Sequence, residues 1–160
     1  MKNKIIWLYF ATLIILAFAY NFLTKNQEMG QKNDVLLIKL EEKSPKTLKM
    51  GEITLNIEMA DTEAKRVRGL SGREGLAENE GMLFVFEKEG YYGFWMKDMK
   101  FAIDMAWLDK DKKIIYIEKN VSPSTYPKVF NSPFPSLYVL ETSAEFLSKN
   151  NIKNGDFVAF

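Results

Sequence analysis

An uncharged apolar run near the N-terminus sets the first limit on how this chain can fold. Ile5–Leu23 contains no charged residue and follows the tetrapeptide Met-Lys-Asn-Lys. A helix needs about 20 apolar residues to cross a bilayer, and this run has no polar face that would suit a soluble domain. We therefore predict a transmembrane signal anchor over residues 1–23. A cleaved signal peptide is the alternative, because the Ala-Phe-Ala sequence at residues 17–19 has the small-x-small form of a cleavage site.

The charges around this run indicate on which side of the membrane the rest of the chain lies. Lys2 and Lys4 precede the run and Lys25 and Lys32 follow it, so the positive-inside rule alone gives only a weak bias. A very short tail on the inner side and a large domain on the outer side is the simpler arrangement. We expect the membrane to be a partner through the N-terminal helix, with the domain on the extracytoplasmic side.

The remaining sequence divides into a tether and one domain. Residues 24–46 are polar apart from Val35–Leu40, which could add a strand or pack on the domain, so we expect a tether there. Residues 47–160 are expected to form a single globular domain, which at about 110 residues is long enough for its own core.

Alternating and short apolar runs predict a domain rich in β-structure. Strands are expected at Ile53–Met59, Gly81–Phe86, Tyr91–Met96, Phe101–Leu108, Ile114–Val121, Leu137–Glu141 and Phe157–Phe160. A short helix over Thr62–Arg68 would begin at an Asp61 cap and end at Gly69, and Thr142–Glu145 matches a capping box that would open a second helix to about Lys149. The predicted fold class is α+β, with about seven strands in a twisted sheet or partly closed barrel and two short helices, preceded by one transmembrane helix.

The composition excludes several kinds of chemistry. The chain has no His and no Cys, which rules out Ser-His-Asp and Cys-His catalysis, thiol redox work, disulfides and Cys/His zinc sites. The net charge of +1, with basic residues spread along the chain, predicts no nucleic-acid partner. We predict no metal and no cofactor, and any acid–base chemistry would have to use Asp, Glu, Lys or Tyr.

Several blocks of the sequence together resemble one known family. Ile57–Gly75 is followed in order by GMLFVF, GFWMKDMKFAIDMAWLD, YVLE and IKNGDFVAF. This order resembles the family called domain of unknown function 192, small prokaryotic proteins that often follow a signal or anchor segment. The resemblance covers roughly Thr47 to Phe160 and implies a compact, mostly β domain, but no established activity. Asp98 stands where the family typically has Asn, which would change the charge of any ligand contact made there.

The arginines are clustered in one short stretch. Arg66, Arg68 and Arg73 lie within eight positions of one another, and all the other basic residues are lysines. A guanidinium group binds carboxylate or phosphate bidentately, so the cluster indicates a need for that geometry. Arg66 and Arg68 are two residues apart on a predicted helix, so at most one of them can share a site with Arg73. The cluster predicts either an anion site or ion pairs with core acids such as Asp104 and Glu141.

Three acidic residues are candidates for a role in a site. Alternation along its strand places Asp104 between Ala102 and Ala106, where its carboxylate would be accessible. It could act as a general acid or bind a ligand, or form a structural ion pair, and Arg73 is its expected partner. Asp98 with Asp104, or with Glu141, could provide the paired carboxylates of a glycoside hydrolase.

An aromatic segment precedes these acids. Tyr92, Phe94 and Trp95 could form a stacking platform for a sugar or another planar ligand, or they could pack in the core. Successive strand residues face opposite ways, so Phe94 and Trp95 should not both line one cleft. Lys97 could be a counter-ion for a bound anion, or a solvated lysine at a strand end.

These observations give three hypotheses for the function. The first is a membrane-tethered extracytoplasmic binding domain for a small polar or anionic ligand, with a glycan as one candidate. Its expected ligand-binding residues are Arg68, Arg73, Trp95, Lys97, Asp98, Asp104 and Glu141. The second is a protein-interaction or assembly module without a small ligand. The third is a carboxylate-dependent envelope hydrolase, although we expect a binding protein rather than an enzyme.

Overall fold

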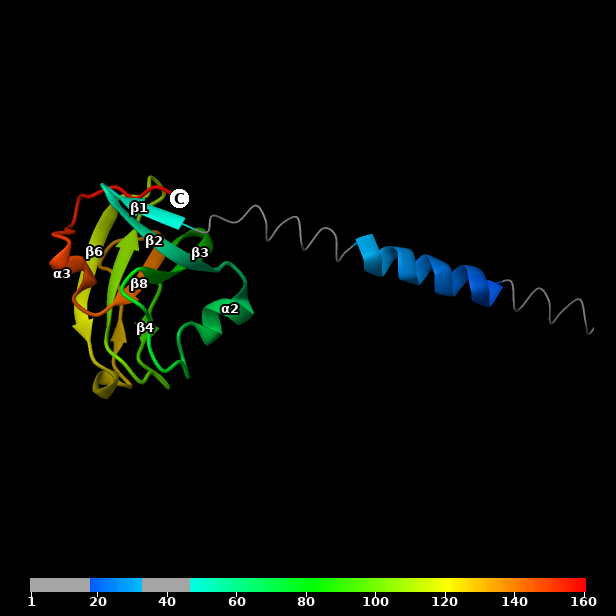
Figure 1. Ribbon diagram of the computed structural model, residues 1–160, viewed down its shortest axis with the longest axis horizontal. Helices are drawn as coiled ribbons and strands as arrows, with labels where there is room; N and C mark the ends of the chain where they lie inside the picture. Colours follow the sequence, from blue (N-terminus) through cyan, green and yellow to red (C-terminus); the bar gives the residue numbers. More distant parts are fainter. Residues whose placement is uncertain (1–17, 33–46) are drawn as a thin grey trace, which may run out of the picture. The chain divides into compact units, whose positions relative to one another are not determined.

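Two parts of the chain, residues 18–32 and 47–160, are described by the computed structural model (Figure 1). Residues 18–32 are helical, so helical structure includes residues 24–32 of the expected tether. Among the described residues, no helix is long and apolar enough to cross a membrane. Most of the predicted anchor, Ile5–Leu23, lies outside the described residues, as does Val35–Leu40. The anchor therefore stays a prediction.

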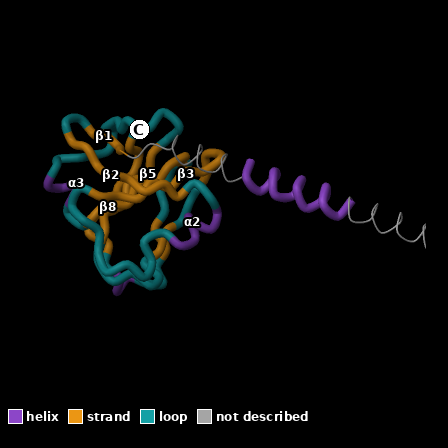
Figure 2. The backbone as a smooth tube through the Cα atoms, turned by 45° about the vertical axis from the view of Figure 1, so that its right-hand side comes forward, coloured by secondary structure: helices purple, strands orange, loops and turns teal. Residues whose placement is uncertain are grey.

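The globular part is built on a six-stranded sheet with the order β1-β2-β3-β8-β5-β6, and β4 and β7 form a separate two-stranded sheet. The strands are β1 (Thr47–Met50), β2 (Ile53–Ala60), β3 (Glu80–Gly90), β4 (Phe94–Trp95), β5 (Ile103–Leu108), β6 (Ile114–Val121), β7 (Val129–Phe130) and β8 (Ser136–Ser143). Figure 2 shows that strands make up most of the regular structure of this part. The predicted α+β class with a mostly β domain is confirmed, with eight strands rather than about seven.

The helix α2, Glu63–Arg68, connects two parallel strands, β2 and β3. It begins where the side chain of Thr62 accepts a hydrogen bond from the backbone N–H of Lys65 at 3.3 Å. It ends at Gly69, whose φ of 50° lies in the left-handed region that favours glycine. The predicted helix is confirmed, but its N-cap is Thr62 rather than Asp61.

Apolar side chains cover both faces of the six-stranded sheet. One cluster contains Leu48, Met50, Leu55, Ile57, Leu83, Ala106, Leu108, Ile114, Leu140, Phe146, Leu147, Ile152 and Val158. The cluster on the other face contains Ala60, Leu70, Met82, Phe84, Met96, Ile103, Met105, Trp107, Val121, Phe130 and Val139. β5 contributes alternate residues to the two clusters, which confirms the alternation predicted for this strand.

The predicted strand Tyr91–Met96 is reduced to the two residues of β4. Phe94 pairs with Phe130 of β7, and Trp95 pairs with Val129. A Cβ atom on Gly93 would lie 2.6 Å from Cγ1 of Val129, so this close approach of the two segments requires a glycine. The β4–β7 ribbon therefore forms a small separate layer beside the main sheet.

Residues 157–160 connect the two edges of the main sheet. At the β1 edge, the backbone groups of Lys49 and Ala159 exchange hydrogen bonds of 2.8 and 2.9 Å. Beside the start of β6, Lys113 and Phe157 form an isolated bridge. Figure 2 shows the C-terminus next to β1. The predicted terminal strand is reduced to these bridges, and within residues 47–160 the edge strands β1 and β6 do not pair directly to close a barrel.

Asp104 on β5 is fully buried and holds three backbone amides. Its Oδ1 accepts hydrogen bonds from the N–H groups of Asn120 at 2.7 Å and Glu145 at 3.2 Å, and its Oδ2 accepts one from Leu147 N–H at 2.9 Å. The last two belong to the start of α3, Phe146–Lys149. The capping box predicted for this helix is wrong, because the capping carboxylate comes from β5. Asp104 is thus a structural residue that joins β5, β6 and α3.

We expect Asp104→Ala to destabilise the domain. The change leaves the buried N–H of Leu147 and the part-buried N–H groups of Asn120 and Glu145 without their acceptor. A buried N–H without an acceptor costs about 1–3 kcal/mol, so the free energy of unfolding should fall by about 3 kcal/mol. Urea denaturation at pH 7 measures this loss. Asp111→Ala, at an exposed turn residue, is the control and should change stability by less than about 0.5 kcal/mol. Equal effects of the two substitutions would contradict the anchoring role of Asp104.

Candidate ligand-binding site

A cavity of about 370 Å³ lies between α2, the loop that follows it, β4 and the central strands of the sheet. Natural small-molecule sites have volumes of about 300–1,000 Å³, so the cavity is of suitable size for a small ligand. It is lined by Glu63, Arg66, Val67, Arg68, Gly69, Leu70, Ser71, Phe84, Phe86, Tyr92, Gly93, Phe94, Trp95, Met99 and Glu141. In Figure 1, α2 and β4 lie near each other beside the sheet.

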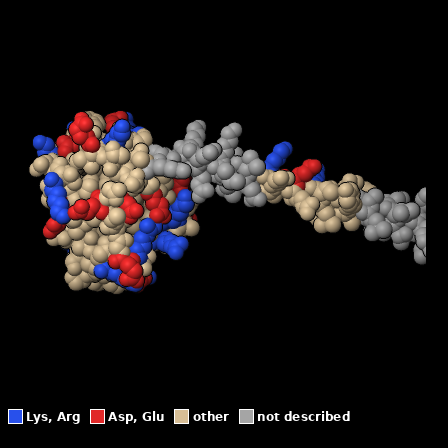
Figure 3. Space-filling view, in the orientation of Figure 1, with Lys and Arg blue, Asp and Glu red and all other residues tan. Residues whose placement is uncertain are grey.

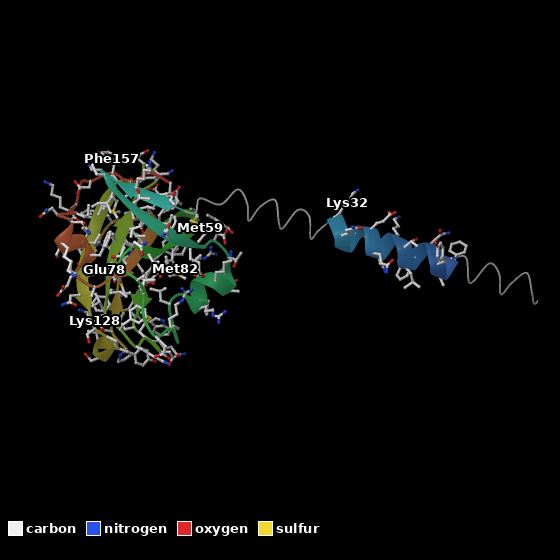
Figure 4. All side chains as sticks on the ribbon, in the orientation of Figure 1. Lys32, Met59, Glu78, Met82, Lys128 and Phe157 are labelled. Carbon is white, nitrogen blue, oxygen red and sulfur yellow. The ribbon has the colours of Figure 1, made fainter. Side chains whose placement is uncertain are left out.

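The floor of the cavity is formed by Phe84 of β3 and Glu141 of β8, which are 2% and 5% exposed. In the strand register, Glu141 pairs with Met82 on β3 and with Met105 on β5. Paired residues of neighbouring strands point to the same face, so Glu141 lies on the face that carries the Met82 and Met105 cluster. Figure 4 labels Met82 and so locates this part of the sheet.

The carboxyl group of Glu141 is buried without a compensating partner. Among residues 47–160, its side chain forms no hydrogen bond or ion pair. Every fully buried side-chain N or O atom of the described residues has a hydrogen-bond partner, so the Glu141 oxygens cannot be fully buried. Its oxygens therefore reach the cavity. Burial raises the pKa of Glu141 to about 8, and the positive charge of Arg73 opposes this rise only in part. At pH 7 the group is mostly protonated and can donate a hydrogen bond into the cavity.

The walls of the cavity are aromatic. The Phe94 ring makes edge contacts with Phe84 at 4.8 Å and with Trp107 at 6.0 Å between centroids. The rings of Phe86 and Tyr92 stack with an interplanar angle of 6°. Trp107 Nε1 donates a hydrogen bond to the backbone oxygen of Tyr92 at 3.1 Å, which fixes this segment on the sheet. The walls therefore present rigid apolar surfaces suited to a flat or apolar ligand body.

Trp95 lies at the rim of the cavity and is 51% exposed. The prediction that Phe94 and Trp95 cannot both line one cleft is wrong, since both line this cavity. β4 is only two residues long and runs along the edge of the cavity, so Phe94 reaches it from the core side and Trp95 from the solvent side. Tyr92, Phe94 and Trp95 thus form one wall and part of the rim, and their role as a stacking platform for a ligand stays a prediction.

The three clustered arginines have three different environments. The Arg66 guanidinium donates to the backbone oxygens of Asp61 at 3.0 Å and Val85 at 2.9 Å, which fixes it in the wall. Arg68, the exposed last residue of α2, lies on the rim and forms no ion pair with any described residue. Arg73 lies outside the cavity.

The predicted pairing of Arg73 with Asp104 is wrong. Arg73 Nη2 lies 2.7 Å from Glu58 Oε2, in a half-exposed ion pair with β2. Asp104 is occupied by backbone amides on the opposite face of the sheet, so it is neither accessible nor near an arginine partner. Arg73 still influences the cavity, because its charge acts on Glu141.

Lys97 and Asp98 lie in the turn after β4 and do not line the cavity. Lys97 Nζ lies 5.7 Å from the centroid of the exposed Trp95 ring. The backbone oxygens of the turn hold the loop after α2: Lys97 O accepts from Ser71 Oγ at 2.9 Å, and Asp98 O accepts from Gly72 N–H at 2.9 Å. Both residues therefore position the rim through their backbone.

The paired carboxylates predicted for a hydrolase are not brought together. In the β5–β8 register Asp104 pairs with Thr142 and Met105 pairs with Glu141, so Asp104 and Glu141 point to opposite faces. Asp98 is exposed in a turn with a φ of 57°. Across the described ranges, no group of three or more acidic side chains could hold a metal ion.

The contribution of β3 to the site is absent from the prediction. Phe84 and Phe86 line the cavity, whereas the apolar run Gly81–Phe86 predicts only a strand and no role in a site. Alternation along β3 places both rings on one face and could have grouped them. Their position beside Glu141 depends on the β3–β8 pairing, which local sequence does not specify.

The sequence profile of the family DUF192, described as Uncharacterized ACR, matches residues 46–160. The chain belongs to the DUF192 family. The predicted family resemblance is thereby confirmed, and the cavity lies entirely within the DUF192 domain.

Two solved structures share the fold of this DUF192 domain. A candidate transcription regulator from Sinorhizobium meliloti 1021 is 28% identical, with a TM-score of 0.66 over 71% of this chain and 89% of that chain. A protein of unknown function from Novosphingobium aromaticivorans DSM 12444 is 26% identical, with a TM-score of 0.68 over 71% of this chain and 84% of that chain. No curated protein matches the chain.

The raised pKa of Glu141 predicts how stability depends on pH. Between its ordinary pKa of 4.5 and its folded value of about 8, the unfolded state has released the proton while the folded state retains it. Stability therefore falls as pH rises through this window, by at most about 1.4 kcal/mol per pH unit. Glu141→Gln keeps the shape but cannot ionise, so its free energy of unfolding relative to wild type should increase by about 2 kcal/mol from pH 5.5 to 7.5.

Urea denaturation at several pH values tests this difference. Asp111→Asn removes an exposed carboxylate and is the matched control, for which a profile parallel to wild type is expected. If Glu141→Gln also gives a parallel profile, Glu141 does not carry a raised pKa.

Proposed function

We propose that this protein is a membrane-tethered extracytoplasmic binding domain for a small polar or anionic ligand, with a glycan as one candidate. The observation that carries the proposal is the carboxyl group of Glu141, a residue 5% exposed, whose oxygens reach an aromatic cavity and form no hydrogen bond or ion pair with the described residues. Burying such a group without a hydrogen bond is costly, so a ligand that completes its hydrogen bonding would stabilise the folded domain.

The lining of the cavity supports binding of a ligand with both apolar and polar parts. Aromatic rings form the walls, and polar groups occur at the floor and the rim. The exposed guanidinium of Arg68 is available for an anionic ligand group, because among the described residues it forms no ion pair. Trp95 on the rim offers a ring face on which a sugar or another planar group could stack.

The surface charges support a small ligand rather than a nucleic acid. Figure 3 shows Lys and Arg interleaved with Asp and Glu over the visible face of the globular part. Nucleic-acid-binding domains usually carry a continuous basic patch or stripe. The mixed charges of this face give no support for a regulator of transcription, which is the description of one relative.

A protein-interaction module is the second candidate, and one observation favours it. Large apolar side chains on and near the β4–β7 ribbon are about half exposed: Trp95, Tyr126, Val129 and Phe134. Exposed apolar groups of this kind occur at interaction sites. The hydrolase hypothesis has less support, because Asp104 and Glu141 face opposite sides of the sheet.

Blocking the mouth of the cavity should abolish ligand binding without unfolding the domain. Val67 is an exposed residue of α2 on the rim, so Val67→Trp would fill the mouth with little strain. A panel of glycans and metabolites is screened with wild type by thermal shift, since a ligand at 100 times its Kd stabilises the folded state by about 2.7 kcal/mol. The shift should disappear in Val67→Trp.

Ala64→Trp is the control, since Ala64 is also exposed on α2 but does not line the cavity. It should keep the full thermal shift. A ligand that stabilises both variants equally would bind elsewhere. If no small ligand binds, and a purified partner protein binds the domain only when Trp95 and Val129 are intact, the interaction module is the better assignment.

The tether and the location of the domain rest on the uncharged run Ile5–Leu23 and its short basic tail. The full-length chain should remain in the membrane fraction after an alkaline carbonate wash. Protease added to the outside of spheroplasts should digest residues 47–160, whereas a cytoplasmic control protein should stay intact. Release of the domain into the soluble fraction would indicate a cleaved signal peptide, and protection from the protease would contradict the extracytoplasmic location.

A further inference from the structure

The cavity offers a ligand two different polar contacts at two depths. Glu141 lies at the floor and is 5% exposed, whereas Arg68 lies on the exposed rim at the end of α2. The same cavity is lined by the stacked rings of Phe86 and Tyr92 and by the ring of Phe94. A ligand that fills the cavity must therefore have a polar inner end, an apolar middle and a polar outer end.

One positive charge, that of Arg73, acts on Glu141 from outside the lining of the cavity. The other charged or titratable side chains that line the cavity are Glu63, Arg66, Arg68 and Tyr92. Glu58, the ion-pair partner of Arg73, is the register neighbour of Met82 and so lies on the same face of the sheet as Glu141. The register neighbours of Glu141, Met82 and Met105, carry no charge. Arg68 favours an anionic ligand group at the rim, and the charge of Arg73 disfavours a cation at the floor.

The floor is suited to a neutral hydrogen-bond acceptor. The Glu141 oxygens are not fully enclosed and form no hydrogen bond with the described residues, and Phe84, which lines the same cavity, is apolar. A protonated carboxyl group donates one hydrogen bond, and an amide carbonyl oxygen is a strong neutral acceptor. An acceptor without charge avoids the cost of bringing an ion to a buried floor.

We propose, on the basis of the binding function above, that the ligand is a compact N-acylated carboxylic acid. Its carboxylate binds Arg68 at the rim, its apolar or ring-shaped body lies between the aromatic walls, and its amide carbonyl accepts a hydrogen bond from the Glu141 carboxyl group. Such acids have either an amino-acid body or a sugar body, and the two sources share this recognition chemistry.

Calorimetric titration of the full-length chain in nanodiscs tests this ligand class. N-acetyl-L-phenylalanine and N-acetylmuramic acid are the probes for the two sources. N-acetyl-L-phenylalaninamide lacks the carboxylate, and L-phenylalanine has an ammonium group in place of the amide. We expect at least one N-acylated acid to bind, and each matched control to bind about tenfold more weakly, as the loss of one good hydrogen bond predicts.

Substitutions at the two polar ends separate their roles. Glu141→Gln retains a donor and should bind the N-acylated acid with an affinity that does not change between pH 6.5 and 9. Wild type should lose roughly tenfold in affinity over that range, because Glu141 ionises. Glu141→Ala should weaken binding about tenfold at pH 6.5, and Arg68→Gln should weaken the acids about tenfold but leave the amide unaffected.

Each other outcome overturns the proposal in a recognisable way. Tighter binding of L-phenylalanine, together with loss of binding in Glu141→Gln, would show that the floor accepts a cation. If neither acid binds while some other ligand is blocked by Val67→Trp, the ligand class is wrong and the binding function stands. If Val67→Trp blocks no ligand at all, the binding function itself is wrong.

Discussion

The pairing of β8 with β3 on one side and β5 on the other is the interaction on which the rest of the structure depends. β8 joins the parallel β2–β3 unit to the antiparallel β5–β6 pair. Because side chains alternate along a strand, its two registers decide which residues enter which core. A shift of one residue would send Glu141 to the other face of the sheet and remove its carboxyl group from the floor of the aromatic cavity.

Two buried acids on this sheet show how differently a fold can treat a carboxyl group. Asp104 receives three backbone N–H groups and acts as a cap for α3 and a link to β6. Glu141 receives none from the described residues, and burial raises its pKa, which the charge of Arg73 offsets only in part. The first carboxylate supports the fold, whereas the second adds a cost that the fold itself does not require. Such a cost is characteristic of residues that serve binding.

Local patterns predict the elements of this protein better than they predict its site. Alternation of apolar residues predicts β5 and places Met105 and Trp107 on one face. Gly69 correctly predicts where the helix α2 ends. The prediction for Asp104 fails because burial and hydrogen bonding at that position depend on α3, which lies about forty residues away in sequence. The site contains Glu141, Arg68 and Trp95 as predicted candidates, but only strand order brings Phe84 beside them, and no local signal encodes strand order.

The bridges made by residues 157–160 also bear on how the protein avoids misassembly. Open sheet edges are templates for pairing with other chains, and here β1 and the start of β6 are covered by a segment that lies C-terminal to every strand. During synthesis both edges stay uncovered until that segment leaves the ribosome. The nascent domain is therefore most exposed to aggregation just before residues 157–160 emerge, and its solubility depends on a few residues outside its regular strands.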